Sequence, residues 1–127
     1  MVFENNVGKI LSFIAEGLIL FDSKGKITFV NPHASLLLGY TIEDIVGKHI
    51  DKVFDIFVDE KKIKPEGAIY YKMFKENKLF SASKGKVIYF KNQIGEKFPV
   101  FISIKKITIK KEVGGVLVFR DITTREE

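Results

Sequence analysis

The chain contains no cysteine. Disulfide bonds, thiolate metal sites and cysteine nucleophiles are therefore excluded, and so is the flavin photochemistry that forms a cysteinyl adduct. Histidine is scarce as well, because His33 and His49 are the only two. Each lies near the start of a short helix predicted below, where we expect a surface or capping role rather than metal ligation.

The chain also lacks a long apolar run. Its longest runs, such as Gly17–Phe21 and Val113–Phe119, are far shorter than the ~20 residues that a membrane span needs. Residues Met1–Lys9 carry acidic and amide side chains and no apolar signal core. We therefore expect a cytoplasmic location and no membrane contact by this segment.

The composition that remains is that of an ordinary globular domain. The 127 residues are 46% hydrophobic and 29% charged, which fits one domain that buries roughly two-thirds of the surface its unfolded chain exposes. The net charge of +5 comes from 21 basic and 16 acidic residues, but the lysines are spread along the chain. Since charge runs of this kind usually form a solvated surface, we expect no nucleic-acid partner.

An amphipathic helix is predicted near the N-terminus. Four apolar residues recur there at helical spacing and would form one face that requires a covering surface. They are Val7, Ile10, Leu11 and Ile14. We divide the chain into this flanking helix (1–16), one core (17–120) and the start of a further helix (121–127).

A β-hairpin is predicted next. Gly17–Asp22 and Lys26–Val30 are rich in strand-forming residues, and Asp22–Gly25 between them has the composition of a tight turn. Asp22 is expected to accept hydrogen bonds within that turn.

Two short helices follow the hairpin. Asn31 suits the N-cap and Pro32 the first helical position, so a helix is predicted over Pro32–Leu38, with Gly39 ending it. A second helix is predicted to begin at Thr41, which is followed by acidic residues, and to end at Gly47.

Helical spacing continues in the middle of the chain, and strands return in its last third. Ile50, Val53, Phe54 and Phe57 extend the helical pattern, and a further helix is predicted over Ala68–Asn77. Three antiparallel strands are then predicted, at Lys86–Phe90, Phe98–Ile109 and Val116–Arg120, with turns at Asn92–Gly95 and Gly114–Gly115.

This order of two strands, several short helices and three strands resembles the PAS fold, and specific residues strengthen the likeness. Near the N-terminus they are Glu16–Asp22, Gly25–Ile27, Val30–Asn31, Ala34, Leu38–Tyr40, Glu43 and Gly47–Lys48. Near the C-terminus, Phe119–Thr123 resembles the D-I-T element at which PAS domains join an output helix. The resemblance implies an α+β PAS fold: a five-stranded antiparallel sheet with short helices on one face and the N-terminal helix on the other.

In PAS domains the concave sheet face and the short helices enclose a pocket. The pocket residues implied by this resemblance are Ile19, Phe21, Thr28, Val30, Ala34, Leu38, Phe54, Ile69, Met73, Leu117 and Phe119. Because nearly all of them are apolar, they would suit a small apolar ligand. A filled core without a ligand is the alternative, since protein interiors usually pack densely.

The opposite sheet face is expected to be apolar too. Successive strand residues point to opposite faces, which assigns to this outer face Leu18, Leu20, Ile27, Phe29, Val116 and Val118. A sheet with one solvated face should instead alternate apolar and polar residues, so we expect a cover. The flanking helix is the nearest cover, from its own chain or a partner, and we predict a homodimer built on that helix and this face.

Resident cofactors are not expected. Haem-binding PAS domains use a histidine on the helix before the third strand, and Ala68–Asn77 contains none. Flavin held without a covalent link would need amide side chains on the late strands, whereas Asn92 and Gln93 fall in a predicted turn. The acidic residues between 55 and 60 suit a solvated helix end better than a Ca²⁺ site.

The predicted pocket has no convergent set of titratable groups, so we expect no enzymatic activity. The resemblance implies a regulatory sensor and dimerisation module of a prokaryotic signalling protein, such as a histidine kinase or a cyclic-dinucleotide enzyme. A C-terminal effector domain would follow it, and Asp121 and Thr123 would relay the signal by fixing the angle at which the chain leaves the sheet. The alternative is a ligand-free structural dimerisation module of the same kind of protein.

Overall fold

The computed structural model describes residues 16–53, 55–63, 70 and 86–123. The predicted flanking helix lies outside the described residues, apart from Glu16, and so does the predicted helix over Ala68–Asn77, apart from Tyr70. Within the described residues, no helix is both long enough and apolar enough to span a membrane.

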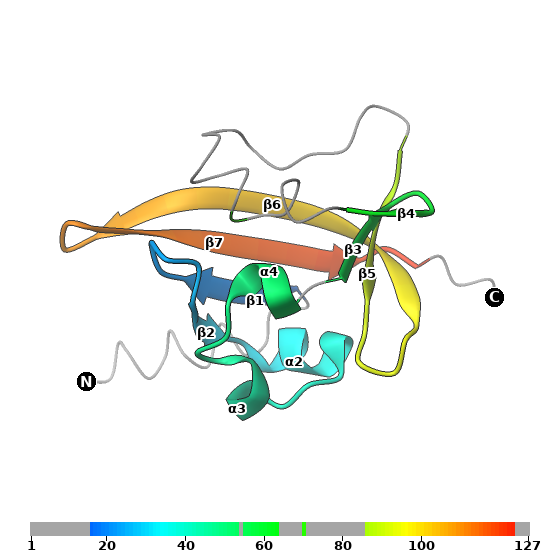
Figure 1. Ribbon diagram of the computed structural model, residues 1–127, viewed down its shortest axis with the longest axis horizontal. Coiled ribbons are helices and arrows are strands. Elements are labelled where there is room, and N and C mark those ends of the chain that lie inside the picture. Colours follow the sequence, from blue (N-terminus) through cyan, green and yellow to red (C-terminus); the bar gives the residue numbers. More distant parts are fainter. Residues whose placement is uncertain (1–15, 54, 64–69, 71–85, 124–127) are drawn as a thin grey trace.

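One antiparallel sheet forms the body of the molecule, and short helices lie against one of its faces (Figure 1). The strand order is β2-β1-β7-β6-β5-β3-β4. The strands are β1 (Gly17–Phe21), β2 (Ile27–Val30), β3 (Asp55–Val58), β4 (Lys61–Lys62), β5 (Ile88–Lys91), β6 (Lys97–Ile109) and β7 (Glu112–Asp121). Between β2 and β3 the chain forms the helices α2 (Pro32–Leu38), α3 (Ile42–Ile45) and α4 (Ile50–Val53). The α+β class predicted from the sequence is confirmed.

The first hairpin and the two helices after it match the sequence predictions closely. Asp22 Oδ1 accepts 2.9 Å hydrogen bonds from the N–H groups two and four residues later. Helix α2 spans the predicted residues, and Gly39 follows it with a left-handed φ of 78°. Thr41 caps α3 by accepting a 3.3 Å hydrogen bond from the N–H of Asp44. Local capping and turn chemistry thus decide this part of the fold.

The prediction that helical structure continues through Phe57 is wrong. Helix α4 ends at Val53, and β3 pairs antiparallel with β5, placing Ile56 opposite Phe90. Ile56 is buried in the core while the other residues of β3 are only half-buried, which is the alternation of a strand. Pairing with β5 outweighs the helical spacing here, because strand preference depends on the neighbouring strand. With β3 and β4 the sheet has seven strands rather than the predicted five.

The predicted turn at Gly114–Gly115 is also wrong, because β7 runs straight through both glycines. The reversal occurs instead at Lys110 and Lys111, whose φ angles are 50° and 68°. Gly115 lies opposite Phe21 of β1, and a Cβ atom on Gly115 would stand 2.1 Å from Cζ of the Phe21 ring. The glycine therefore makes room for an aromatic ring within the sheet and does not mark a turn.

This close approach yields a testable prediction. We expect Gly115→Ala to lower the free energy of unfolding by about 2–3 kcal/mol, because the buried Phe21 ring must move to admit the methyl group. Urea denaturation followed by circular dichroism measures the loss. In the double variant Gly115→Ala/Phe21→Leu the smaller Leu side chain makes room for the methyl group. The double variant should therefore lose less stability than the sum of the losses of the two single variants. Strict additivity would contradict the proposed steric cause.

The faces predicted for Ile27 and Thr28 are reversed in the structure. Leu20 pairs with Phe29, but the next residue of β1, Phe21, pairs with Ile27, so Thr28 is an extra residue in β2. Ile27 is consequently 1% exposed and belongs to the core, whereas Thr28 is exposed on the outer side. A β-bulge of this kind moves the residues on one side of it to the opposite face, which strict alternation cannot predict.

Candidate functional site

The inner face of the sheet carries the core. Apart from Thr28, the predicted pocket residues that fall within the described part of the chain are all buried, at most 3% exposed: Ile19, Phe21, Val30, Ala34, Leu38, Leu117 and Phe119. Strands β1, β2 and β7 and helix α2 bring these side chains together. Phe54, Ile69 and Met73 lie outside the described residues, so their predicted place in the lining stays a prediction.

An aromatic cluster on the inner face was missed by the sequence analysis. The Phe90 ring meets the Phe119 ring edge-on at a centroid distance of 5.0 Å and the Phe98 ring at 6.3 Å. The rings come from β5, β7 and β6, so they join the two halves of the sheet. The alternation of β6, with Phe98, Val100 and Ile104 buried, was the signal that could have found this half of the inner face.

Among the described residues, Asn31 is the one polar or charged residue that is fully buried. Its Oδ1 accepts hydrogen bonds from the N–H groups of Leu18 (3.0 Å) and Ala34 (2.9 Å). Its Nδ2 donates a 2.9 Å hydrogen bond to the carbonyl of Glu16. The predicted capping role is confirmed, but the side chain also fastens the start of β1 to the start of α2.

His49 and Tyr70 fasten the first hairpin to the helical side of the molecule. The two rings meet edge-on at a centroid distance of 4.9 Å, and His49 packs so closely over Gly25 that a Cβ there would lie 2.3 Å from Nε2. Tyr70 donates from its hydroxyl to the carbonyl of Ser23 (2.7 Å), and its N–H donates to Asp51 Oδ1 (2.9 Å). Within the part of the chain that the structure describes, no three His, Asp or Glu side chains gather as a metal site would require.

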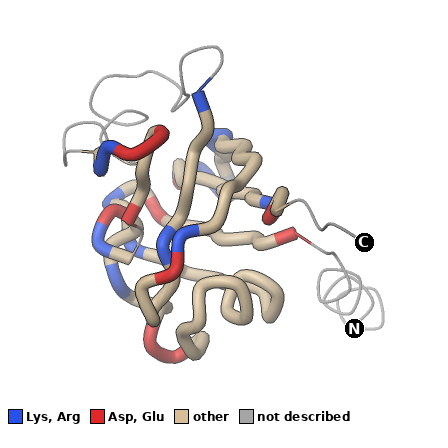
Figure 2. Tube along the Cα trace, turned by 90° about the vertical axis from the view of Figure 1, so that its right-hand side faces the viewer, with Lys and Arg blue, Asp and Glu red and all other residues tan. Residues whose placement is uncertain are grey.

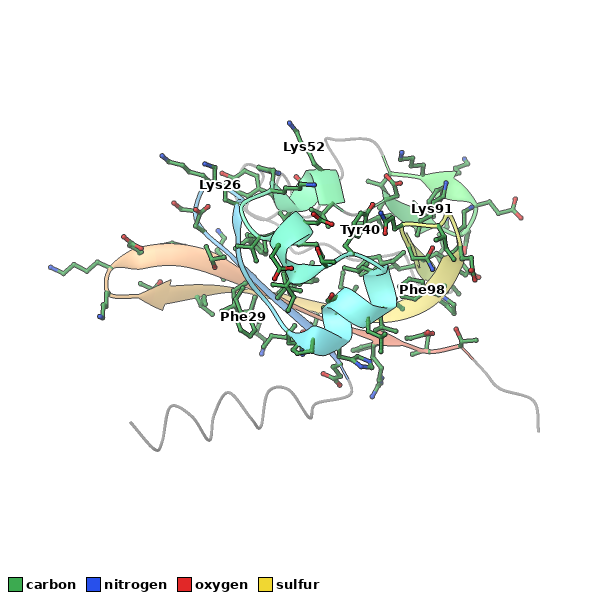
Figure 3. The ribbon with its side chains drawn as sticks, turned by 90° about the horizontal axis from the view of Figure 1, so that it is seen from below. Lys26, Phe29, Tyr40, Lys52, Lys91 and Phe98 are labelled. Carbon is green, nitrogen blue, oxygen red and sulfur yellow. The ribbon has the colours of Figure 1, made fainter. Side chains whose placement is uncertain are left out.

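The outer face of β2, β1 and β7 carries a half-exposed apolar surface. We call it the outer face patch, and it consists of Leu18, Leu20, Phe29, Val116 and Val118. In Figure 3, Phe29 lies on the sheet among the strands that form this surface. Ile27, which the sequence assigned to it, belongs to the core. Val7, Ile10, Leu11 and Ile14 lie outside the described residues, so their predicted contact with the patch stays a prediction.

Charged residues border this apolar surface, and on β6 the exposed Lys105 lies opposite Val116. Figure 2 shows Lys, Arg, Asp and Glu mainly on the turns and strand ends, with other residues along most of the strands. At the edge of the patch, the Arg120 guanidinium lies 4.0 Å from the Glu16 carboxylate and 5.7 Å from the centre of the Phe101 ring. Phe101 itself is 60% exposed, so apolar surface continues onto β6.

The end of β7 has a defined exit geometry. Asp121 Oδ1 accepts hydrogen bonds from the N–H (2.8 Å) and the hydroxyl (2.5 Å) of Thr123. Ile122 donates its N–H to the carbonyl of Pro99, at 3.0 Å, which ties the exit to the start of β6. Asp121 therefore holds the backbone at Thr123, and the role predicted for these two residues in relaying a signal remains a prediction.

Comparison with known proteins gives one consistent answer. A family model described as PAS domain matches residues 15–124. No curated protein sequence matches. Among solved structures, the PAS domain of nitrogen regulation protein NR(II) from Vibrio parahaemolyticus is similar, with a TM-score of 0.68, 17% identity, and coverage of 91% of this chain and 97% of that one.

Two further solved structures are similar over nearly their whole length. The PAS domain of an HTR-like protein from Haloarcula marismortui has a TM-score of 0.71 and 16% identity, covering 95% of this chain and 93% of that one. A PAS domain from a two-component sensor histidine kinase has a TM-score of 0.67 and 11% identity, with coverage of 94% and 96%. The fold that the sequence resemblance implied is confirmed by these structures.

Proposed function

Because this chain belongs to the PAS domain family, we propose that it is a sensory and regulatory domain of a signal-transduction protein. The proposal includes one domain spanning residues 1–127, with a flanking segment at 1–16, a core at 17–120 and the start of an output linker at 121–127. It places the domain in the cytoplasm of a prokaryotic cell, upstream of a C-terminal effector. A histidine kinase or a cyclic-dinucleotide enzyme suits that position, and the similarity to a PAS domain from a sensor histidine kinase supports it.

The domain senses by binding a small apolar ligand or a partner and carries out no chemistry. Support for this comes from the inner face, where buried aliphatic and aromatic side chains converge from the sheet and α2. Such a lining suits burial of apolar surface, but it offers no acid, base or nucleophile. We propose that the domain holds no haem, flavin or metal and has no enzymatic activity.

The observation that carries the proposal is the outer face patch. Five half-exposed apolar residues on the adjacent strands β2, β1 and β7 form a contiguous surface. A contiguous apolar surface of this kind usually marks an interface. We propose that two copies of the chain associate through this patch and the flanking segment 1–16.

The signal passes from the core to the chain exit through the sheet itself. Leu117 and Phe119 of β7 face the core, while Val116 and Val118 of the same strand belong to the outer face patch. A ligand that prefers one packing of the core therefore shifts β7, and with it both the dimer contacts and the Asp121–Thr123 exit. The size of the response is set by the difference in ligand affinity between the two packings.

Native mass spectrometry of protein purified without added ligand tests the sensor function. We expect a bound small molecule of low polarity, or else a rise in melting temperature with at least one member of a lipid and metabolite panel, since a ligand at 100 times its Kd adds ~2.7 kcal/mol of stability. An empty protein whose melting temperature does not change with any compound would instead favour the alternative, a structural dimerisation module.

A further inference from the structure

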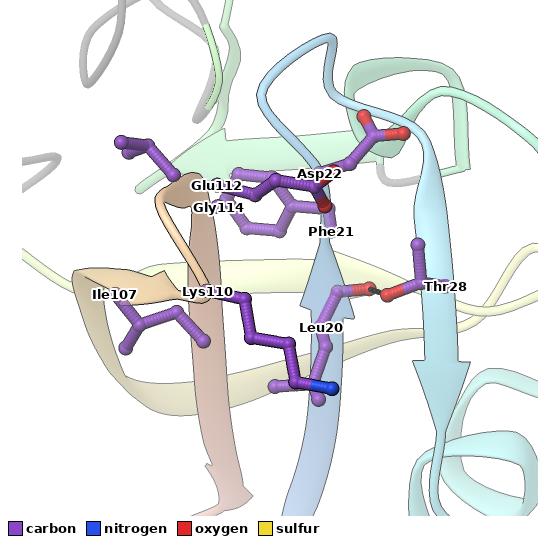
Figure 4. Close-up of a pocket in the computed structure, with 9 residues that line it drawn as sticks. Leu20, Phe21, Asp22, Thr28, Ile107, Lys110, Glu112 and Gly114 are labelled. Atoms are coloured by element: carbon purple, nitrogen blue, oxygen red, sulfur yellow. Dashed lines mark hydrogen bonds between the residues drawn. The ribbon is translucent and has the colours of Figure 1, made fainter.

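A second surface lies at the end of the sheet, where the turns of two hairpins meet. We call it the hairpin groove; the residues that line it include Leu20, Thr28, Ile107, Lys110, Glu112 and Gly114. The groove is open to solvent and has a volume of about 320 Å³. In Figure 4 the Lys110 side chain extends across it toward the strand that carries Leu20. Leu20 and Ile107 give it an apolar floor.

The groove exists because β6 and β7 are longer than β1. The pairing of β1 with β7 covers Gly115–Phe119 and stops before Gly114. Gly114 approaches the end of β1 so closely that a Cβ atom would lie 2.5 Å from the Phe21 carbonyl oxygen. Beyond that point β7 continues alongside open space, and an extended chain can lie along a strand edge of this kind.

Positive charge surrounds the groove. Lys24 and Lys26 are exposed on the β1–β2 turn, and Lys110 and Lys111 are exposed on the β6–β7 turn. Of the nearby carboxylates, that of Asp22 already accepts hydrogen bonds from its own turn. The carboxylates of Asp22 and Glu112 both line the groove, so the four ammonium groups outnumber two acids, and the excess positive charge favours an anionic occupant.

The apolar floor decides between anionic occupants. A nucleic acid would place phosphates on the lysines but would leave Leu20 and Ile107 unused, whereas a peptide can carry both carboxylates and apolar side chains. The structure thus leads us to propose that the hairpin groove binds an extended acidic segment of a partner protein. Apolar side chains of that segment cover Leu20 and Ile107, and its carboxylates pair with lysines of both turns.

A labelled synthetic peptide tests this interaction with the full chain. The probe alternates Glu and Leu over about eight residues, an extended length of ~26 Å, and fluorescence anisotropy measures its binding. We expect saturable binding that weakens about tenfold in Lys24→Glu/Lys110→Glu. The matched control Lys61→Glu/Lys86→Glu makes the same change in net charge away from the groove and should bind like the unmodified chain. Thermal melts establish that both variants are folded.

Three results would overturn the proposal. The first is equal loss of peptide binding in both double variants, which would indicate a general charge effect. The second is equal binding of a peptide with Ser in place of Leu, which would show that the apolar floor contributes nothing. The third is displacement of the peptide by duplex DNA that binds more tightly, which would show that the lysines bind a nucleic acid. Both substituted lysines lie outside the outer face patch, so the charge changes leave the patch itself intact. Leu20 belongs to both surfaces, so peptide binding and dimerisation are expected to compete for it.

Discussion

Replacing Asn31 with alanine is expected to lower the free energy of unfolding by about 3 kcal/mol or more. The side chain is 0% exposed and serves three backbone groups, the N–H groups of Leu18 and Ala34 and the carbonyl of Glu16. Alanine removes the hydrogen-bond partner of all three backbone groups at once. An unsatisfied buried group costs ~1–3 kcal/mol, and loss of a helix N-cap alone costs ~1 kcal/mol.

Urea denaturation followed by circular dichroism measures this loss, and the chain offers a matched control. Asn92 accepts one exposed 2.9 Å hydrogen bond from the N–H of Glu96 with its side chain, so Asn92→Ala should cost about 1 kcal/mol or less. Asn31→Asp keeps the acceptor oxygen but loses the donor to Glu16, and it buries a carboxylate. Equal losses for Asn31→Ala and Asn92→Ala would contradict the account of Asn31 as the fastening of β1 to α2.

The second large effect is expected on association. We expect Val118→Asp to weaken dimerisation at least 100-fold, about 2.7 kcal/mol, because the substitution places a carboxylate in the centre of an apolar interface. Val118 lies on β7 between Leu18 of β1 and Ser103 of β6. Sedimentation velocity over a range of concentrations measures the change.

Val46→Asp is the control for this variant. Val46 caps α3, is 41% exposed, and lies on the helical side of the sheet, so the same substitution there should leave dimerisation unchanged. Circular dichroism establishes that both variants keep their strands. A Val118→Asp protein that dimerises like the unmodified chain would show that the outer face patch is not the interface.

Local chemistry made the first part of this fold predictable. The Asp22 turn, the Asn31 cap, Pro32 and Gly39 each act within a few residues, so the sequence alone locates the hairpin and α2. The alternating residues Ile19, Phe21, Leu117 and Phe119 likewise predicted the inner face, because pleating requires them to share a side.

Contacts between distant residues explain what the sequence could not predict. The stretch around Ile56 has helical spacing, and it is a strand because β5 is available to pair with it. Gly114 and Gly115 have the composition of a turn, and their real role is visible only once Phe21 lies beside them. The bulge at Thr28 reverses two side chains, and no local signal in β2 announces it.

The candidate site shows the same division. An asparagine before a proline predicts a helix cap, but the bonds from Asn31 to Leu18 and Glu16 depend on how β1 and β2 pair. The hairpin groove depends on the different lengths of β1 and β7, which became clear only when the turn was placed at Lys110 and Lys111.

The central claim is that two copies of the chain associate with their outer face patches toward each other. Because the chain has no cysteine, Ser103→Cys allows one spin label to be attached beside Val118, and Lys61→Cys provides a label at the far edge of the sheet. Pulsed electron–electron double resonance measures the distance between the two spin labels of a dimer. The account predicts labelled Cα atoms about 10 Å apart at position 103 if the sheets meet directly, or about 20 Å apart if a helical layer lies between them, with a much longer distance at position 61. No dipolar coupling at position 103, or a shorter distance at position 61, would contradict it.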